Sequence, residues 1–327
     1  MNYRDVGITH TASFLPKKIV TNQDIVDMGV DTNDTWIREK LGIKERRWAD
    51  KEATSDLAAE AGKRVLEKAK LKPEKVDLIV IATSTPDSVT PSTSCYVQEK
   101  IGAVNAGAFD VLNACSGFNY GVATASKFVA DNSYDNVLVV GAEIPSRFRV
   151  ESERTNYTIF SDGAGAVLLQ EVEKGFGLKA NYLRADGRGA NKLVVKGFGT
   201  AHSREENAHL YIFAKMDGRA IWDFALKAIP DAVNNCLKKA NMKKDELDFI
   251  IFHQANLNII KEGMKILGLP MEKTFTNIEK YGNTIAASIP IALNEAIEKG
   301  KIKQGDNVML VGFGAGLSWG ANLLKWY

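Results

Sequence analysis

The chain repeats its own pattern of elements, and this repeat constrains the fold more than any other feature of the sequence. Four segments of the first half recur in the same order in the second half. The matching pairs are Asp56–Ala69 with Asp223–Leu237, Asp77–Ala82 with Asp248–His253, Phe109–Cys115 with Thr274–Asn283, and Asn136–Gly141 with Asn307–Gly312. Because chance would hardly give four matches in one order, we infer an internal duplication. We expect one domain at residues 1–172 and a second at residues 173–327.

The predicted strands are almost continuously apolar. Val76–Thr83, for example, is a run of mostly β-branched and apolar residues between two predicted helices. Such runs are typical of strands in parallel sheets that helices cover on both faces. Two halves of this kind, packed together, give an α/β fold with five layers in the order α-β-α-β-α. We expect parallel strands to dominate both sheets.

The composition excludes several classes of protein. Of the 327 residues, 45% are hydrophobic and 25% are charged, as in ordinary soluble proteins, and a net charge of +2 offers no field that attracts nucleic acid. The three cysteines form neither a CxxC motif nor a disulfide framework, so no metal site is expected. The N-terminus lacks the apolar core of a signal peptide, and no apolar run reaches the ~20 residues that span a membrane. We expect a cytoplasmic protein without membrane contact.

Cys115 is the first candidate for chemistry. The segment Phe109–Leu112 predicts a short buried strand, and apolar residues at helical spacing begin after Gly117. Cys115 therefore lies at or just before a helix N-terminus, where the helix dipole lowers the pKa of a thiol and favours a nucleophilic thiolate. The alternative is a buried structural thiol, which is the commoner fate of a free cysteine.

His253 and Asn283 are the partners that the repeat suggests for Cys115. All three fall at the carboxyl ends of predicted strands, where α/β proteins place active sites. A cysteine nucleophile needs a base or cation nearby, and a developing oxyanion needs neutral N–H donors. Taken singly, His253 is equally compatible with a core histidine and Asn283 with a turn residue. The glycine-rich Phe313–Leu317 lacks the full GxGxxG of a nucleotide loop, and we interpret it as a turn between strands.

Several motifs follow one another in a specific order: DTWI, NACSGF, FSDGAGA, HQAN, YGNT and GFGAGLSWG. In this combination the sequence resembles, over essentially its whole length, the β-ketoacyl-acyl-carrier-protein synthase III family of the thiolase superfamily. The resemblance implies a thiolase-like form of the five-layer fold. It also implies an acyltransferase without a cofactor, because the thioesters of coenzyme A (CoA) and acyl carrier protein (ACP) are its substrates.

The resemblance assigns the chemical steps to particular residues. Cys115 would attack an acyl-CoA and hold the acyl group on sulfur. His253 and Asn283 would assist the decarboxylation of malonyl-ACP and stabilise the resulting enolate, whose carbanion attacks the acyl-enzyme to give a 3-oxoacyl-ACP. The backbone N–H groups of Cys115 and Ala315 would form the oxyanion hole. The product would start a fatty-acid chain.

The resemblance also suggests how the substrates are bound. Family members stack the CoA adenine on a tryptophan and bind its phosphates with arginines; Trp36 and Arg154 match such positions, and Lys40 replaces an arginine, which keeps the charge but loses the bidentate fork. The other residues expected to contact CoA or ACP are Arg219, Gln254, Ala255, Asn256, Asn258 and Lys261. Asn258 stands where the family often has an arginine that docks ACP, a charge that Lys261 and its neighbour Lys265 could replace. For Arg219, an ordinary surface ion pair is an equal alternative.

Thr90 and Trp222 are the residues expected in the acyl pocket. Thr90 stands where acetyl-using members have a bulky aromatic residue that closes the pocket from across a homodimer interface, so a longer or more polar primer is implied. For Trp222 the alternative is a core aromatic residue.

Two alternative functions stay open beside this one. The first is a primer-specific ketosynthase of secondary metabolism, or an acyltransferase acting on a hydroxyl or amine. The second is a non-catalytic partner subunit, although such subunits usually lack the cysteine.

Overall fold

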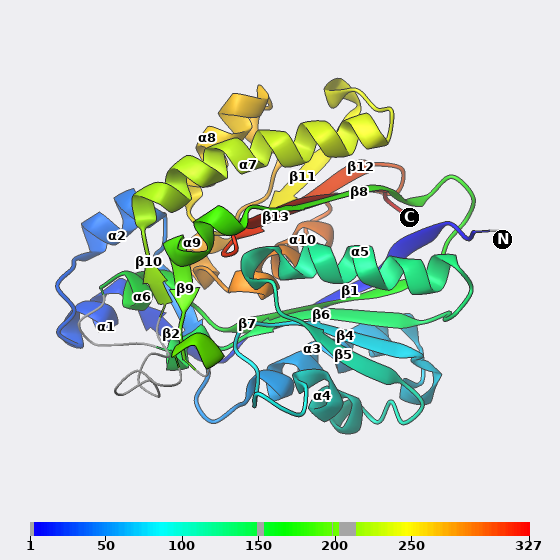
Figure 1. Cartoon of the computed structure of the whole chain (residues 1–327), viewed down its shortest axis with the longest axis horizontal. Helices are drawn as coiled ribbons and strands as arrows, with labels where there is room; N and C mark the ends of the chain where they lie inside the picture. Colours follow the sequence, from blue (N-terminus) through cyan, green and yellow to red (C-terminus); the bar gives the residue numbers. More distant parts are fainter. Residues whose placement is uncertain (1–2, 149–153, 198, 203–213) are drawn as a thin grey trace.

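The structure is a computed structural model that describes residues 3–148, 154–197, 199–202 and 214–327. Within these residues, two large sheets lie one above the other, with helices between them and on both outer faces (Figure 1). The layers therefore follow the order α-β-α-β-α, as the sequence predicts. No helix in the described ranges is long and apolar enough to cross a membrane.

Sheet 1 is built from the first half of the chain, with the strand order β1-β7-β6-β4-β5. In that order the strands are Val6–Phe14, Gly163–Glu171, Val137–Glu143, Leu78–Ala82 and Gly107–Val111. Strand β4 runs parallel to β5 and β6, whereas β7 runs antiparallel to β6 and β1. One side of the sheet is therefore parallel and the other antiparallel.

Sheet 2 repeats this arrangement with the order β8-β13-β12-β11. In that order the strands are Gly177–Ala185, Ser318–Lys325, Asn307–Gly314 and Phe249–Phe252. Strands β11 and β12 are parallel, and β13 is antiparallel to β12 and β8. The prediction that parallel strands dominate both sheets is therefore wrong. The turn between β12 and β13 is too short for a crossover connection, so these strands have to be antiparallel.

A pair of helices forms each helical layer. From the outer face of sheet 1 to the outer face of sheet 2, the pairs are α3 (Thr54–Ala69) with α4 (Thr93–Ile101), α5 (Gly117–Ala130) with α10 (Ser288–Glu298), and α7 (Gly218–Lys239) with α8 (Leu257–Leu267). Helices α5 and α10 lie between the sheets (Figure 1). Each half of the chain thus contributes one helix to the central layer.

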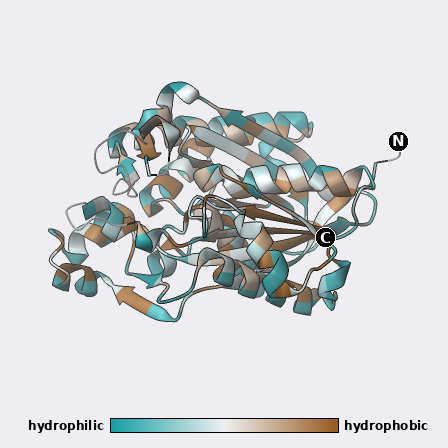
Figure 2. Ribbon diagram, turned by 60° about the horizontal axis from the view of Figure 1, so that its bottom comes forward, coloured by the Kyte–Doolittle hydropathy of each residue, from teal (hydrophilic) through white to brown (hydrophobic). Residues whose placement is uncertain are grey.

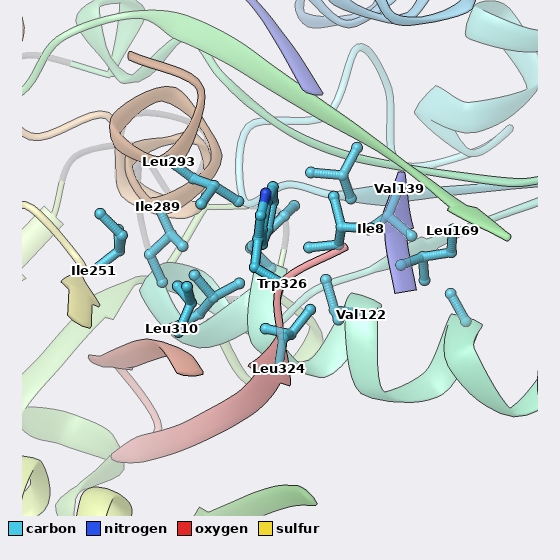
Figure 3. Close-up of a cluster of buried hydrophobic side chains, with 14 of the residues drawn as sticks. Ile8, Val122, Val139, Leu169, Ile251, Ile289, Leu293, Leu310, Leu324 and Trp326 are labelled. Atoms are coloured by element: carbon cyan, nitrogen blue, oxygen red, sulfur yellow. The ribbon is translucent and has the colours of Figure 1, made fainter. Parts of the chain in front are cut away.

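The continuous apolarity of the strands follows from this layering. In β4, Leu78 and Val80 face the central helices, while Ile79 and Ile81 face α3 and α4. Successive side chains of a strand point to opposite faces, so a strand covered on both faces must be apolar at every position. The brown, hydrophobic strands in the middle of Figure 2 show this pattern. In Figure 3, side chains from both sheets and from α5 and α10 meet in the central cluster around Trp326.

The duplication extends to the turns that precede the central helices. A 3₁₀ turn, Ala114–Ser116, leads into α5, and a second one, Ile285–Ala287, leads into α10. Both turns begin with a non-glycine residue in the left-handed region, with φ of 45° for Ala114 and 50° for Ile285. The structure therefore aligns Cys115 with Ala286 of the second half, and not with Asn283.

Shorter elements gather at the end of the molecule where these two turns lie (Figure 1). They are β2 (Lys18–Thr21), α1 (Asn22–Asp27), α2 (Asp34–Leu41), β3 (Glu45–Trp48), α6 (Arg154–Ile159), β9 (Leu193–Val195), β10 (Ala214–Met216) and α9 (Ile278–Tyr281). Two of their boundaries have local causes: the Thr21 side chain caps α1, and Gly42, with φ of 82°, ends α2.

Strand β5 is an edge strand. Among the described residues it pairs with β4 alone, and Leu112, directly after its end, is 76% exposed. The prediction of a buried strand over Phe109–Leu112 is therefore wrong for this chain by itself. Apolar residues predict that a strand will be covered, but they do not identify what covers it.

Candidate active site

Cys115 lies in the turn between β5 and α5, as predicted, and is only 7% exposed. The turn packs against the end of β12 and the start of β13. The hydroxyl groups of Ser116 and Ser318 are 2.7 Å apart, and a Cβ atom added to Gly314 would lie 3.0 Å from the Cys115 sulfur. Only glycine allows the backbone of β12 to approach the sulfur so closely.

His253 follows β11 and is held on several sides. Its backbone N–H donates to the carbonyl of Val311 at 2.8 Å, and its ring meets the ring of Phe313 edge-on, with centroids 5.5 Å apart. Nδ1 lies 2.6 Å from the Ser288 hydroxyl oxygen. Because the residue is 1% exposed, burial lowers the pKa of the imidazole to about 3. His253 is therefore neutral at physiological pH.

Asn283 is fixed by both its backbone and its side chain. Its N–H donates to the carbonyl of Ile159 at 2.9 Å, and its carbonyl accepts from Ser161 N–H at 3.0 Å. The side-chain Oδ1 accepts from the N–H of Ile285 at 2.8 Å. This bond identifies Nδ2 as the remaining polar group of the side chain, a neutral donor of the kind expected from the sequence.

A cavity of about 220 Å³ brings Cys115, His253 and Asn283 together. The rest of its wall is mostly apolar and comes from α2, α6, β9, β10, α7, α8 and β12. These lining residues are Trp36, Leu41, Thr158, Ile159, Phe160, Leu193, Met216, Gly218, Ile221, Trp222, Ala255, Asn256, Ile259, Phe313 and Gly314. An apolar cavity with a few convergent polar groups is the usual form of a small-molecule site.

The charge state of Cys115 differs from the one expected. Burial and, to a smaller extent, the nearby Glu143 carboxyl group together raise the pKa of its thiol to about 12. The position before α5 favours a thiolate, but full desolvation of the sulfur outweighs that effect. The expectation of a depressed thiol pKa is therefore wrong.

Glu143, at the end of β6, is a buried carboxyl group that sequence reasoning missed. It is 0% exposed and accepts hydrogen bonds from the Thr85 hydroxyl at 2.7 Å and from Ser84 N–H at 3.0 Å. Burial raises its pKa to about 8. An acidic residue that continues a fully buried apolar strand, directly after Val137–Ala142, was the available signal. Ser288 was also missed, because a serine at the start of a helix is commonplace.

Trp36 and Arg154 lie against each other near the cavity. The Arg154 guanidinium carbon is 4.4 Å from the centroid of the Trp36 ring, and Trp36 lines the cavity. Lys40 is exposed in the last turn of α2. A planar base and negatively charged groups are the chemistry that such a cluster favours.

The HQAN segment, His253–Asn256, mainly connects the start of α8 to β11 and to the end of α2. Gln254 is 1% exposed, and its amide donates to the Phe252 carbonyl at 2.8 Å, so it supports the loop from inside. The amides of Asn256 and Asn258 donate to the backbone carbonyl of Lys40 at 2.8 and 3.1 Å. Of the binding residues expected in this segment, Ala255 and Asn256 line the cavity.

The remaining predicted residues lie at different distances from the chemistry. Trp222 lines the cavity, whereas the Arg219 side chain is 84% exposed and pairs with Asp223 at 3.1 Å. Lys261 is exposed on α8. Ala315 directly follows Gly314 at the end of β12. Thr90 is exposed and is not part of the cavity wall in this chain.

The five layers, with a buried cysteine at the start of a central helix, define a thiolase-fold enzyme. Family models described as "3-Oxoacyl-[acyl-carrier-protein (ACP)] synthase III" and as its C-terminal part match residues 109–187 and 237–326. A protein of Caldanaerobacter subterraneus subsp. tengcongensis named β-ketoacyl-[acyl-carrier-protein] synthase III is 48% identical over 326 residues, which cover 98% of this chain and 97% of that protein. The chain belongs to the β-ketoacyl-acyl-carrier-protein synthase III family.

Solved structures agree with this membership. The crystal structure of 3-oxoacyl-[acyl-carrier-protein] synthase III from Aquifex aeolicus VF5 superposes with a TM-score of 0.92 at 40% identity, covering 98% of this chain and 100% of that one. The priming β-ketosynthase from the R1128 polyketide biosynthetic pathway gives a TM-score of 0.93 at 29% identity, covering 99% and 97% of the two chains. The thiolase-like fold predicted from the sequence is therefore confirmed.

Proposed function

We propose that this protein condenses an acyl-CoA primer with malonyl-ACP, with loss of CO₂, to give a 3-oxoacyl-ACP that starts a fatty-acid chain. One observation carries the proposal: Cys115, neutral His253 and Asn283 line a single, mostly apolar cavity. A nucleophile that stores an acyl group and two neutral donors that stabilise an enolate are the parts that this reaction requires.

In the first half-reaction the Cys115 sulfur attacks the carbonyl carbon of the acyl-CoA. The C–S bond to CoA breaks, and the thiol hydrogen of Cys115 leaves with the CoA sulfur, so no net proton is exchanged. The pKa of about 12 means that the thiol has to lose its proton as the substrate binds and reacts. We assign the oxyanion hole to the backbone N–H groups of Cys115 and Ala315, because Gly314, the residue before Ala315, packs against Cys115.

In the second half-reaction the malonyl group of malonyl-ACP loses CO₂, and its electron pair forms an enolate. His253 and Asn283 donate hydrogen bonds to the thioester oxygen on which the negative charge develops. The enolate carbon then attacks the acyl carbonyl on Cys115, and the departing thiolate takes up one proton from water. The high pKa of the buried thiol favours this uptake and restores the resting state.

For the substrates, the cluster of Trp36 and Arg154 supports a CoA site at the cavity mouth. We propose that the adenine stacks there, and that Lys40 and Arg219 bind phosphates as exposed cations near the mouth. The α8 face with Asn258 and Lys261 would receive the acidic carrier protein. Both substrates would approach from the cytoplasm, and the three cysteines of the chain are all free thiols, which agrees with a reducing compartment.

We further propose that the protein works as a homodimer that joins at β5. This strand has an open edge in the described part of the chain; Leu112, directly after it, and Val89, in the loop between β4 and α4, are 76% and 77% exposed. An open strand edge with exposed apolar side chains is a ready surface for pairing with a second copy. Such a dimer would bring Thr90 of each copy to the acyl pocket of the other.

A primer-specific ketosynthase of secondary metabolism is the second candidate. The TM-score of 0.93 to a priming polyketide ketosynthase shows that the same fold serves that role. A threonine at position 90 in place of an aromatic residue leaves room for a primer longer than acetyl. Incubation with a panel of acyl-CoAs, followed by intact mass measurement of the acyl-enzyme, distinguishes the two candidates by the primer that is transferred.

The half-reactions test the proposal directly. Cys115→Ser should form no acyl-enzyme, because a serine hydroxyl in this turn has no base to ionise it.

His253→Ala and Asn283→Ala should still acquire the acyl group, while malonyl-ACP decarboxylation falls by ~10²-fold or more. Acyl adducts are read by mass and decarboxylation by CO₂ release. His10→Ala, a histidine of β1 outside the cavity, is the matched control. If both half-reactions are lost equally in the His253 and Asn283 variants, these two side chains act only in stabilising the fold.

A further inference from the structure

Among the described residues, the imidazole of His253 has one hydrogen-bond partner, the hydroxyl group of Ser288. Ser288 is the first residue of α10, and its Oγ lies 2.6 Å from Nδ1 of the imidazole. The two side chains are 2% and 1% exposed, so water does not compete for this hydrogen bond. If the bridging hydrogen belongs to the Ser288 hydroxyl, Nε2 carries the ring hydrogen and is a donor in the cavity. If it belongs to Nδ1, Nε2 is an acceptor.

The other contacts of Ser288 decide that question. Its Oγ already accepts the backbone N–H of Gln254 at 3.3 Å, and no other acceptor for its hydroxyl hydrogen lies within hydrogen-bond distance among the described residues. If Nδ1–H donated to Ser288, the hydroxyl hydrogen would be buried without a partner, which is costly. If the hydroxyl donates to Nδ1, each polar group in the contact is satisfied.

We propose that Ser288 is a positioning residue that holds His253 in the tautomer with hydrogen on Nε2. This proposal rests on the function proposed above and deepens it. His253 then presents a permanent N–H donor to the thioester oxygen of the malonyl group. It cannot accept the proton of Cys115, because Nδ1 is blocked by Ser288 and Nε2 already carries hydrogen. His253 therefore acts in the decarboxylation step and not as the base that activates the nucleophile.

The same turn also orients the second donor. Ile285 N–H binds Oδ1 of Asn283 at 2.8 Å, which leaves the NH₂ end of the amide for the substrate. Three residues later in the chain, Ser288 occupies Nδ1 of His253. The turn Ile285–Ala287 and the first residue of α10 thus orient an amide and an imidazole in the same way: the acceptor atom of each side chain is occupied, and its N–H group is left for the enolate oxygen.

Nitrogen-15 NMR of protein labelled at histidine tests the tautomer without reference to activity. The chain contains four histidines, so His253 can be assigned by comparison with His253→Ala. In the unmodified protein near neutral pH we expect hydrogen on Nε2 and an acceptor-type signal from Nδ1. In Ser288→Ala the Nδ1 signal should shift as the Nδ1–H tautomer becomes populated, and Ser288→Thr, which keeps a hydroxyl, should restore it. Hydrogen on Nδ1 in the unmodified protein would overturn the proposal.

Kinetics of the half-reactions provide the second readout. Ser288→Ala should slow malonyl-ACP decarboxylation by ~10-fold, as expected for weakening one oriented donor, and change self-acylation by less than about twofold. Ser126→Ala is the matched control, since Ser126 is a buried serine of α5 whose hydroxyl, within the described ranges, donates to the carbonyl of Ala123 in its own helix. Equal slowing of both half-reactions, or no slowing of either, would refute the assignment. If the tautomer is as expected but the unmodified protein does not decarboxylate malonyl-ACP, the proposed function fails and the tautomer assignment stands.

Discussion

Burial keeps Cys115, Glu143 and His253 uncharged near neutral pH. It raises the pKa of the thiol to about 12 and that of the carboxyl group to about 8, and it lowers the pKa of the imidazole to about 3. In the proposed reaction negative charge appears on the enolate and on the oxyanions, where fixed neutral donors stabilise it without a competing charge. A permanent cation at His253 would also hold the malonyl carboxylate and oppose its loss as CO₂.

At the scale of single residues, Gly314 decides whether the nucleophile can occupy its position. A Cβ atom at residue 314 would lie 2.7 Å from Cβ and 3.0 Å from Sγ of Cys115, so Gly314→Ala must displace the cysteine. We expect acyl-enzyme formation to fall by ~10-fold or more, because small misplacements of a nucleophile are costly. The rate of the acyl mass adduct is the measurement. Gly187→Ala, where an added Cβ meets no atom within 4 Å, is the control. Equal rates in both variants would contradict this reading.

At the scale of elements, hydrogen bonds to acidic side chains fix the loop between β4 and α4 that carries Thr90. Glu143 binds Ser84 N–H at the start of the loop, and Asp110 of β5 binds Thr93 N–H at its end at 2.7 Å. Asp87 in the middle accepts from Ser55 N–H at 2.9 Å. The loop tip is therefore held in place by sheet 1 and α3, and a change at Thr90 should alter the pocket it faces without rearranging the loop.

Thr90→Phe tests this loop and the proposed dimer together. If Thr90 borders the acyl pocket of a second copy, an aromatic ring fills space that a long primer needs, at a cost of ~1–3 kcal/mol. We expect kcat/KM for dodecanoyl-CoA to fall roughly ten- to hundredfold, with acetyl-CoA spared or improved. Activity is measured from acetyl-CoA to dodecanoyl-CoA, and sedimentation gives the mass of the particle. A monomer, or an unchanged chain-length profile, would remove Thr90 from the pocket.

Local signals in the sequence predicted some elements well, and tertiary packing explains the failures. Thr21 and Gly42 are local signals, a side-chain cap and a glycine in the left-handed region, so the start of α1 and the end of α2 depend on single residues that the sequence displays. Leu112 was misjudged because its apolar side chain does not say what covers it. The pKa of Cys115 was misjudged because burial, which the whole fold creates, outweighs the local helix start. The cavity itself did bring Cys115, His253 and Asn283 together as the strand ends predicted.

At the scale of the whole molecule, the two halves share one core. Helix α5 from the first half and α10 from the second pack in the same cluster, against side chains of both sheets (Figure 3). We propose that the repeat boundary lies at residues 172 and 173, in the connection between β7 and β8. The halves should nevertheless unfold together, because separating them would expose the central layer to water. The site lies where the two halves meet, since each contributes one of the two turns that hold it.

Because the two halves should unfold together, the free energy of unfolding of the whole chain should depend on the charge of the buried Glu143. Its pKa rises from 4.5 in the unfolded chain to about 8 in the folded one, so the folded protein holds a proton that the unfolded chain releases in this interval. The contribution of Glu143 to the free energy of unfolding is therefore fully present below pH 4.5. It is lost as the pH rises towards 8, because only the unfolded chain gains free energy by releasing the proton. The free energy of unfolding of the unmodified protein, minus that of Glu143→Gln, should therefore fall between about pH 5 and pH 8, by at most ~1.4 kcal/mol per unit. Urea unfolding at several pH values measures this difference.

His253 does not disturb the comparison. Its lowered pKa costs stability only as pH falls from 6.5 towards 3, and this effect is present in both proteins and cancels in the difference. Parallel curves for the two proteins would show that Glu143 is already ionised in the fold.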